Sequence, residues 1–143
     1  MKPVLLDTDV LSLYLRQGDA AIVDHCRRYI RQHGRLTLSI LTYYEVVSGL
    51  PYRDARKQLD AFHRFVARNT VLPITEHSAA LAAERYAQLR QRGTPVDDID
   101  LLIAGIALEH GLVLVTRNRR HFDRIEGLTV ADWSESETSG HAP

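Results

Sequence analysis

The chain has 143 residues and a formal net charge of zero, with hydrophobic residues at 45% and charged residues at 25%. These values are ordinary for one globular domain and argue against a disordered, collagen-like or membrane protein. A neutral chain also lacks the basic excess of bulk nucleic-acid binders, so any contact with RNA has to be local. The lone Cys26 excludes an internal disulfide, and with no targeting segment visible we expect a cytoplasmic protein.

Short apolar runs alternate along the chain with longer amphipathic segments. The runs are typical of buried strands and fall at residues 3–6, 36–38, 71–74, 112–115 and 128–130. The other segments repeat apolar residues at helical spacing, at 10–15, 19–33, around 45–47, 53–68, 75–92 and 97–111. Pro73 makes the third run either an edge strand or the weakest strand of the set, because proline cannot donate a hydrogen bond to a sheet. The composition after Trp133 predicts a domain of residues 1–133 and a disordered tail at 134–143.

Alternating strands and helices predict the fold class. We expect an α/β protein with a mainly parallel five-stranded sheet and helices on both faces. In such sheets ligands bind outside the carboxyl ends of the strands. Polar residues that follow strands are therefore the candidates for a functional site.

Four such positions should meet at this edge. Asp7 follows the first strand directly, Glu45 lies in the helix after the second, and Asn118 follows the fourth. Asp100 lies in the first turn of a helix that leads into the fourth strand. Such a helix runs antiparallel to the sheet, so its first turn returns to the same edge.

Clustered carboxylates repel one another, by about 4 kcal/mol for a pair 4 Å apart at an effective dielectric constant of 20. A cation relieves this repulsion. An all-oxygen set of ligands suits Mg²⁺, with Mn²⁺ as a possible substitute, whereas zinc prefers histidine or cysteine.

Structural roles for individual acids stay open beside the functional one. Glu45 stands three residues after Thr42, at the spacing of a capping box. Asp100 could simply favour the dipole of its helix, and Asp97 and Asp98 are expected to be helix caps.

Asp7 and Asp9, the first two acids of the chain, are expected to have different roles. A charge directly after a buried run, as at Asp7, is costly unless it is used. Asp9 is expected to be the N-cap of the first helix.

The sequence resembles PIN-domain toxins of the VapC type. The motifs that carry the resemblance are LLDTDVL at 5–11, TYYEVVSGL at 42–50, GTPVDDIDLLIAGIALEHGLVLVTRNRRHFDRI at 93–125 and the closing VADW. The resemblance covers residues 2–133 and is most specific in its last third. It implies that Asp7, Glu45 and Asp100 bind metal and that Thr116 and Asn118 stand at a fourth, more variable position. Many relatives have aspartate where this chain has Asn118, which supplies no charge.

The resemblance also implies an activity and partners. Such toxins form homodimers and cut structured RNA, often a tRNA anticodon region or a loop of ribosomal RNA. Each is paired with a small DNA-binding antitoxin, here a VapB-like protein, that inserts a segment into the catalytic groove.

A basic segment follows the fourth strand and could contact RNA. It contains Arg117, Arg119, Arg120 and Arg124, which suit contacts to phosphate, although a solvated basic loop is the alternative. Together with Thr116, the first three are the expected substrate-binding residues.

Two other functions compete with a metal-dependent endoribonuclease. The strand ending in Asp7-Thr8-Asp9 resembles the nucleophile and acid of haloacid-dehalogenase phosphatases, but the expected lysine and later acids have no counterpart here. A catalytically inactive PIN-like binding module is the second alternative, and the intact acids weigh against it.

Overall fold

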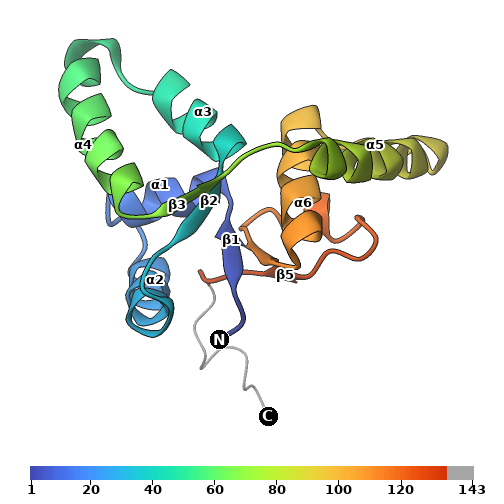
Figure 1. Cartoon of the computed structure of the whole chain (residues 1–143), viewed down its shortest axis with the longest axis horizontal. Coiled ribbons are helices and arrows are strands. Elements are labelled where there is room, and N and C mark those ends of the chain that lie inside the picture. The colour runs from blue at the N-terminus through green and yellow to red at the C-terminus, as the bar shows by residue number, and fades with distance from the viewer. Residues whose placement is uncertain (135–143) are drawn as a thin grey trace.

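The structure is a computed structural model that describes residues 1–134, so all but the first residue of the predicted tail lies outside the described residues. Five parallel strands form one sheet in the order β3-β2-β1-β4-β5 (Figure 1). The strands are β1 (Val4–Leu6), β2 (Thr37–Ser39), β3 (Thr70–Leu72), β4 (Val113–Val115) and β5 (Val130–Ala131). The predicted α/β class and the edge position of the third strand are confirmed.

The helices match the predicted amphipathic segments, with two additions. They are α1 (Thr8–Leu15), α2 (Ala20–His33), α3 (Ile40–Ser48), α4 (Ala55–Ala67), α5 (Glu76–Gln91) and α6 (Asp98–His110). A 3-10 turn at Tyr52–Asp54 precedes α4, where the sequence predicted one continuous helix. The four-residue helix α7 (Arg119–Phe122) was not predicted, because one turn is too short to show a helical period.

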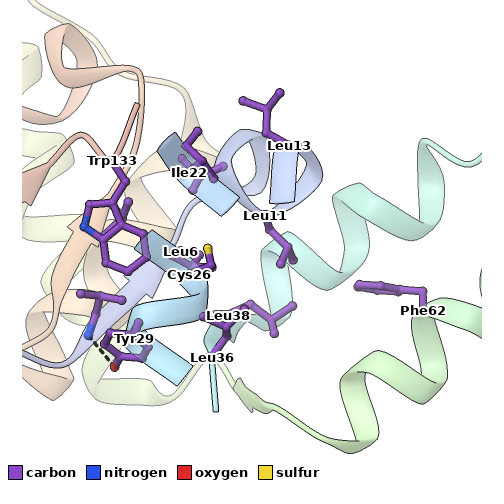
Figure 2. Packing of buried hydrophobic residues seen from close by; sticks show 13 residues of the cluster. Leu6, Leu11, Leu13, Ile22, Cys26, Tyr29, Leu36, Leu38, Phe62 and Trp133 are labelled. Carbon is purple, nitrogen blue, oxygen red and sulfur yellow. Dashed lines mark hydrogen bonds between the residues drawn. The ribbon is translucent and has the colours of Figure 1, made fainter. Parts of the chain in front are cut away.

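The sheet is buried on both faces, because successive strand residues point to opposite sides. On one face Leu6 packs with residues of α1, α2 and α4, including Cys26 and Phe62, and with Trp133, which follows β5 (Figure 2). On the other face Leu5 packs with residues of α5, α6 and α7. Cys26 is completely buried in this core, and burial raises the pKa of its thiol to about 12.

Helix α5 crosses α6 at very close range (Figure 1). A Cβ atom built on Gly105 of α6 would lie 2.4 Å from the backbone oxygen of Ser78 and 3.1 Å from Cβ of Ala82. Only glycine allows this approach. The crossing fixes the direction of α6 and therefore the position of its first turn, which carries Asp100.

Candidate active site

Asp7 is the whole connection between β1 and α1. Its amide donates to the carbonyl of Val115 at 2.9 Å, which extends the pairing of β1 with β4 by one step. Its side chain is the N-cap of α1: Oδ1 accepts from the amide of Thr8 at 2.8 Å. The prediction that Asp9 caps this helix is wrong, because the strand turns into the helix through a single residue and Asp9 already lies in the first turn.

The Asp7 carboxylate is buried, with 5% of its surface exposed, and is held at both oxygens. Oδ2 accepts a hydrogen bond from the hydroxyl of Thr116 at 2.8 Å. Burial raises the pKa of Asp7, and the charges of Glu45 and Asp9 raise it further, while the bonds from Thr116 and Thr8 act in the opposite direction. The charge at Asp7 is therefore costly without a cation.

Glu45 reaches the site from α3, which begins directly after β2. The N-cap is Ser39, the last residue of β2, and its hydroxyl accepts from the amide of Thr42 at 3.1 Å. Glu45 Oε1 accepts from the hydroxyl of Thr8 at 2.6 Å. The proposed capping box of Thr42 with Glu45 is wrong, because α3 begins earlier than that spacing assumed and Thr42 is already inside the first turn.

Asp100 lies in the first turn of α6. Asp97 is the N-cap and accepts from the amide of Ile99 at 3.1 Å, which confirms one predicted cap, whereas Asp98 is the first residue of the helix. The pKa of Asp100 is raised to about 6, mainly by burial. The charges of Asp7, Asp97 and Glu45 also contribute to this rise, whereas His121 acts in the opposite direction.

The charge of Glu45 raises the pKa of both Asp7 and Asp100, and the charge of Asp7 also raises the pKa of Asp100. The three acids therefore lie near one another, although they come from the end of β1, from α3 and from α6. Within residues 1–134, however, no three Asp, Glu, His or Cys side chains already stand as a metal-holding group. The three carboxylates are close enough to repel one another, but they do not surround a common position for a metal ion. Their all-oxygen chemistry and their unrelieved charge fit a hard divalent cation.

The expected fourth position divides into a buried and an exposed part. Thr116 is completely buried, donates to Asp7 and accepts from the amide of Asn118 at 3.0 Å. Asn118 is exposed and stands at the N-cap position of α7, but its side chain makes no capping hydrogen bond. The structure thus places Thr116 beneath the carboxylates and Asn118 at the surface.

The arginines after β4 are exposed. Arg117 Nη1 lies 3.3 Å from Asp9 Oδ2, and Arg119 Nε lies 3.8 Å from Asp123 Oδ2. Arg120 is also exposed. These surface pairs are weak, so the side chains can exchange them for other anions at little cost.

His121 lies beside the site, although no sequence pattern predicted it there. Its Nδ1 lies 3.7 Å from Asp100 Oδ2, and its side chain is 56% exposed. It comes from α7, the helix that was not predicted. His121 and Phe122 lie within the motif at residues 93–125, but nothing in their spacing indicated a contact with Asp100.

A groove of about 460 Å³ opens beside Glu45 between α1, α3 and α4. Its walls are largely apolar and include Leu15, Val46, Leu50 and Phe62, and Arg16 is the one basic residue among the described residues that line it. In the part of the chain that the structure describes, no helix is long and apolar enough to cross a membrane.

Comparison with known proteins identifies the family. The family model described as "PIN domain" matches residues 4–128. A tRNA(fMet)-specific endonuclease VapC of Salmonella typhimurium is 35% identical over 93% of this chain and 99% of its own length. The enzyme of the same name from Shigella flexneri is 30% identical over 94% and 100%.

Similarity to solved structures extends this match to three dimensions. The crystal structure of DNA-bound VapBC from Salmonella typhimurium aligns with a TM-score of 0.81 and 30% identity, over 93% of this chain and 99% of that one. These matches also argue against the haloacid-dehalogenase alternative. The chain belongs to the PIN-domain family and, within it, to the VapC-type ribonuclease toxins.

Proposed function

We propose that this ribonuclease cuts structured RNA with Mg²⁺ held by Asp7, Glu45 and Asp100. Nucleases of the PIN family generally depend on a divalent metal ion. The observation that carries the assignment is the buried Asp7 carboxylate, which shares Thr8 with Glu45 as a hydrogen-bond donor and whose charge raises the pKa of Asp100. Mn²⁺ is the expected substitute, because it accepts the same oxygen ligands.

The residues of the site have separate tasks in this proposal. When bound, Mg²⁺ supplies Lewis-acid polarisation of the attacked phosphodiester and of the water that attacks it. Thr116 and Thr8 orient Asp7 and Glu45 through the hydrogen bonds described above. The carboxylates accept the proton that the attacking water loses. Asn118, at the exposed end of the site, orients the substrate or water through its amide.

The RNA backbone is proposed to lie across the exposed arginines. Arg117, Arg119 and Arg120 are at the same sheet edge as the acids, and their guanidinium groups suit phosphate oxygens. A neutral domain binds RNA through such a local patch rather than through its overall charge. Thr116, once expected to touch substrate, is assigned to positioning Asp7 because it is fully buried.

Initiator tRNA is the first substrate to test. Two relatives at 30% and 35% identity are tRNA(fMet)-specific by name. A VapB-like antitoxin is the proposed partner, because the Salmonella typhimurium neighbour is a VapBC complex. We propose further that the chain forms homodimers and that the antitoxin covers the acidic site.

The test is direct. Purified protein is incubated with initiator tRNA and, as a matched control, with an elongator tRNA, each with Mg²⁺ and with EDTA. We expect internal cuts only in the initiator tRNA that is incubated with Mg²⁺, and none in the elongator tRNA or in EDTA. Resistance of both tRNAs, and of ribosomal RNA incubated in the same way, would favour the inactive binding module instead.

A further inference from the structure

A row of three hydroxyl groups, two of them buried, leads from the end of β2 to Glu45. The hydroxyl of Thr42 lies 3.0 Å from that of Thr8, and Thr8 donates to Glu45 Oε1 at 2.6 Å. Ser39 donates to the Thr42 hydroxyl over a longer 3.5 Å. Thr42 and Thr8 are 34 positions apart, so the row joins α3 to the start of α1.

The direction of these hydrogen bonds follows from the number of protons. A hydroxyl has one proton to donate, and that of Thr8 goes to the Glu45 carboxylate. In the contact between the two threonines, Thr42 must then be the donor. Thr42 can in turn accept the proton of Ser39, whose oxygen already accepts from the Thr42 amide. Every hydroxyl of the row therefore points toward Glu45.

The inner hydroxyls of this row are shielded from water. Ser39 and Thr42 have no exposed surface, so water cannot substitute for a lost hydroxyl without a rearrangement. Thr8, at the outer end, is only partly buried. It serves two carboxylates, because its amide donates to Asp7 and its hydroxyl to Glu45. The orientation of Thr8 therefore sets the relative position of two acids.

We propose that Thr42 is a positioning residue that acts on Glu45 through Thr8. By donating to the Thr8 hydroxyl, Thr42 holds it in the one orientation that serves Glu45. The inference rests on the proposed metal-dependent ribonuclease function, and it adds a buried residue that touches neither metal nor RNA.

The test compares two substitutions at one position. Thr42→Val keeps the shape but removes the donor, whereas Thr42→Ser keeps the donor and loses a methyl group. Thr94→Val is the matched control, because the buried Thr94 hydroxyl has no hydrogen-bond partner among residues 1–134. We expect Thr42→Val to lower kcat about 10-fold with little change in KM for RNA, since one net hydrogen bond is worth about one factor of ten. Thr42→Ser and Thr94→Val should stay within about 2-fold of the parent.

A second readout does not depend on activity. Mn²⁺ binding, measured by calorimetry without RNA, should weaken about 3- to 10-fold in Thr42→Val and recover in Thr42→Ser. If Thr42 acts only through Glu45, Thr42→Val should cause no further loss of Mn²⁺ affinity in a Glu45→Ala background. A structural role alone would weaken binding equally in both backgrounds.

The outcomes separate this inference from the proposed function. Parent-like kcat and Mn²⁺ affinity in Thr42→Val would overturn the positioning role while leaving the ribonuclease intact. A parent protein that neither binds Mn²⁺ nor cuts RNA would instead overturn the proposed function. Should Thr42→Val fail to fold, Thr8→Val replaces it, because Thr8 is partly exposed and keeps its amide bond to Asp7. Parent-like Mn²⁺ affinity in Thr8→Val would then contradict the inference.

Discussion

The hydroxyl of Thr116 donates to Asp7 Oδ2 at 2.8 Å, although the two residues are 109 positions apart. Both follow neighbouring strands, β4 and β1, at the same edge of the sheet. The bond is buried and charge-assisted, so it is among the strongest polar contacts that the site offers. It fixes Oδ2 of Asp7, while the amide of Thr8 holds Oδ1.

Replacing Thr116 tests this role. Thr116→Val should lower cleavage about 10- to 100-fold and raise the pKa of Asp7 further, because a buried carboxylate loses a hydrogen bond worth about 1.5–3 kcal/mol. Thr116→Ser should retain most of the activity. The measurement is kcat for RNA cleavage together with Tm in EDTA. Full activity in Thr116→Val would show that Asp7 needs no such support.

Much of this site is visible in the sequence, because strand and helix alternation predicts which acids meet. The chain order places Asp7, Glu45 and Asp100 at one edge without any knowledge of their contacts. The prediction fails where one residue decides a boundary. Asp9 was expected to cap α1, but β1 ends so close to the helix that Asp7 takes that place.

Contacts between distant side chains could not be predicted in the same way. The pairing of Thr8 with Thr42 depends on how α1 and α3 approach each other across the sheet edge. The approach of His121 to Asp100 depends on a helix of one turn that leaves no periodic signal. Such contacts follow from packing, which no local pattern encodes.

The raised pKa values predict how stability depends on pH without metal. The pKa of Asp100 rises from 3.8 to about 6 on folding, and that of Asp7 is raised as well. Groups raised in this way stabilise the fold at low pH, and this contribution is lost as the pH rises through about 6. In EDTA the protein should therefore lose stability from about pH 4 to pH 7, by at most about 3 kcal/mol from Asp100.

Thermal unfolding in EDTA across this pH range measures the effect. Asp100→Asn is the control, because it removes the titrating group and should flatten the difference between acid and neutral pH. Mg²⁺ added at neutral pH should raise the Tm of the parent more than that of Asp100→Asn. An identical pH profile for both proteins would contradict the electrostatic description of Asp100.

The arginines after β4 should contribute to RNA affinity. Changing Arg117, Arg119 and Arg120 together to Ala should weaken RNA binding and reduce the slope of log K against log salt by up to about two units, because fewer counterions are released. Stability should change little, since exposed ion pairs contribute at most about 1 kcal/mol. A matched control changes the exposed Arg27, Arg31 and Arg35, on and after α2. Equal salt slopes for the two triple variants would place the RNA path elsewhere.

The crossing of α5 and α6 predicts an unusual effect of alanine. Gly→Ala inside a helix normally stabilises by up to about 1 kcal/mol. At Gly105 the new Cβ would meet the Ser78 carbonyl at 2.4 Å, so Gly105→Ala should instead destabilise by about 2 kcal/mol or more. Urea unfolding at fixed pH gives the difference. A stabilised Gly105→Ala would mean that α5 and α6 are not held this closely.

The most direct test of the acidic metal site is RNA cleavage by the parent and by Asp100→Asn, each with Mg²⁺ and with EDTA, with the cut ends mapped. Asp100 is the best position, because its pKa is raised mainly by burial and by neighbouring acids, and its neutralisation should leave the fold intact or more stable. We expect internal cuts by the parent with Mg²⁺ and none in the other three reactions. Mg²⁺-dependent cleavage by a folded Asp100→Asn, or cleavage by the parent in EDTA, would show that cleavage does not depend on a metal ion held by Asp100.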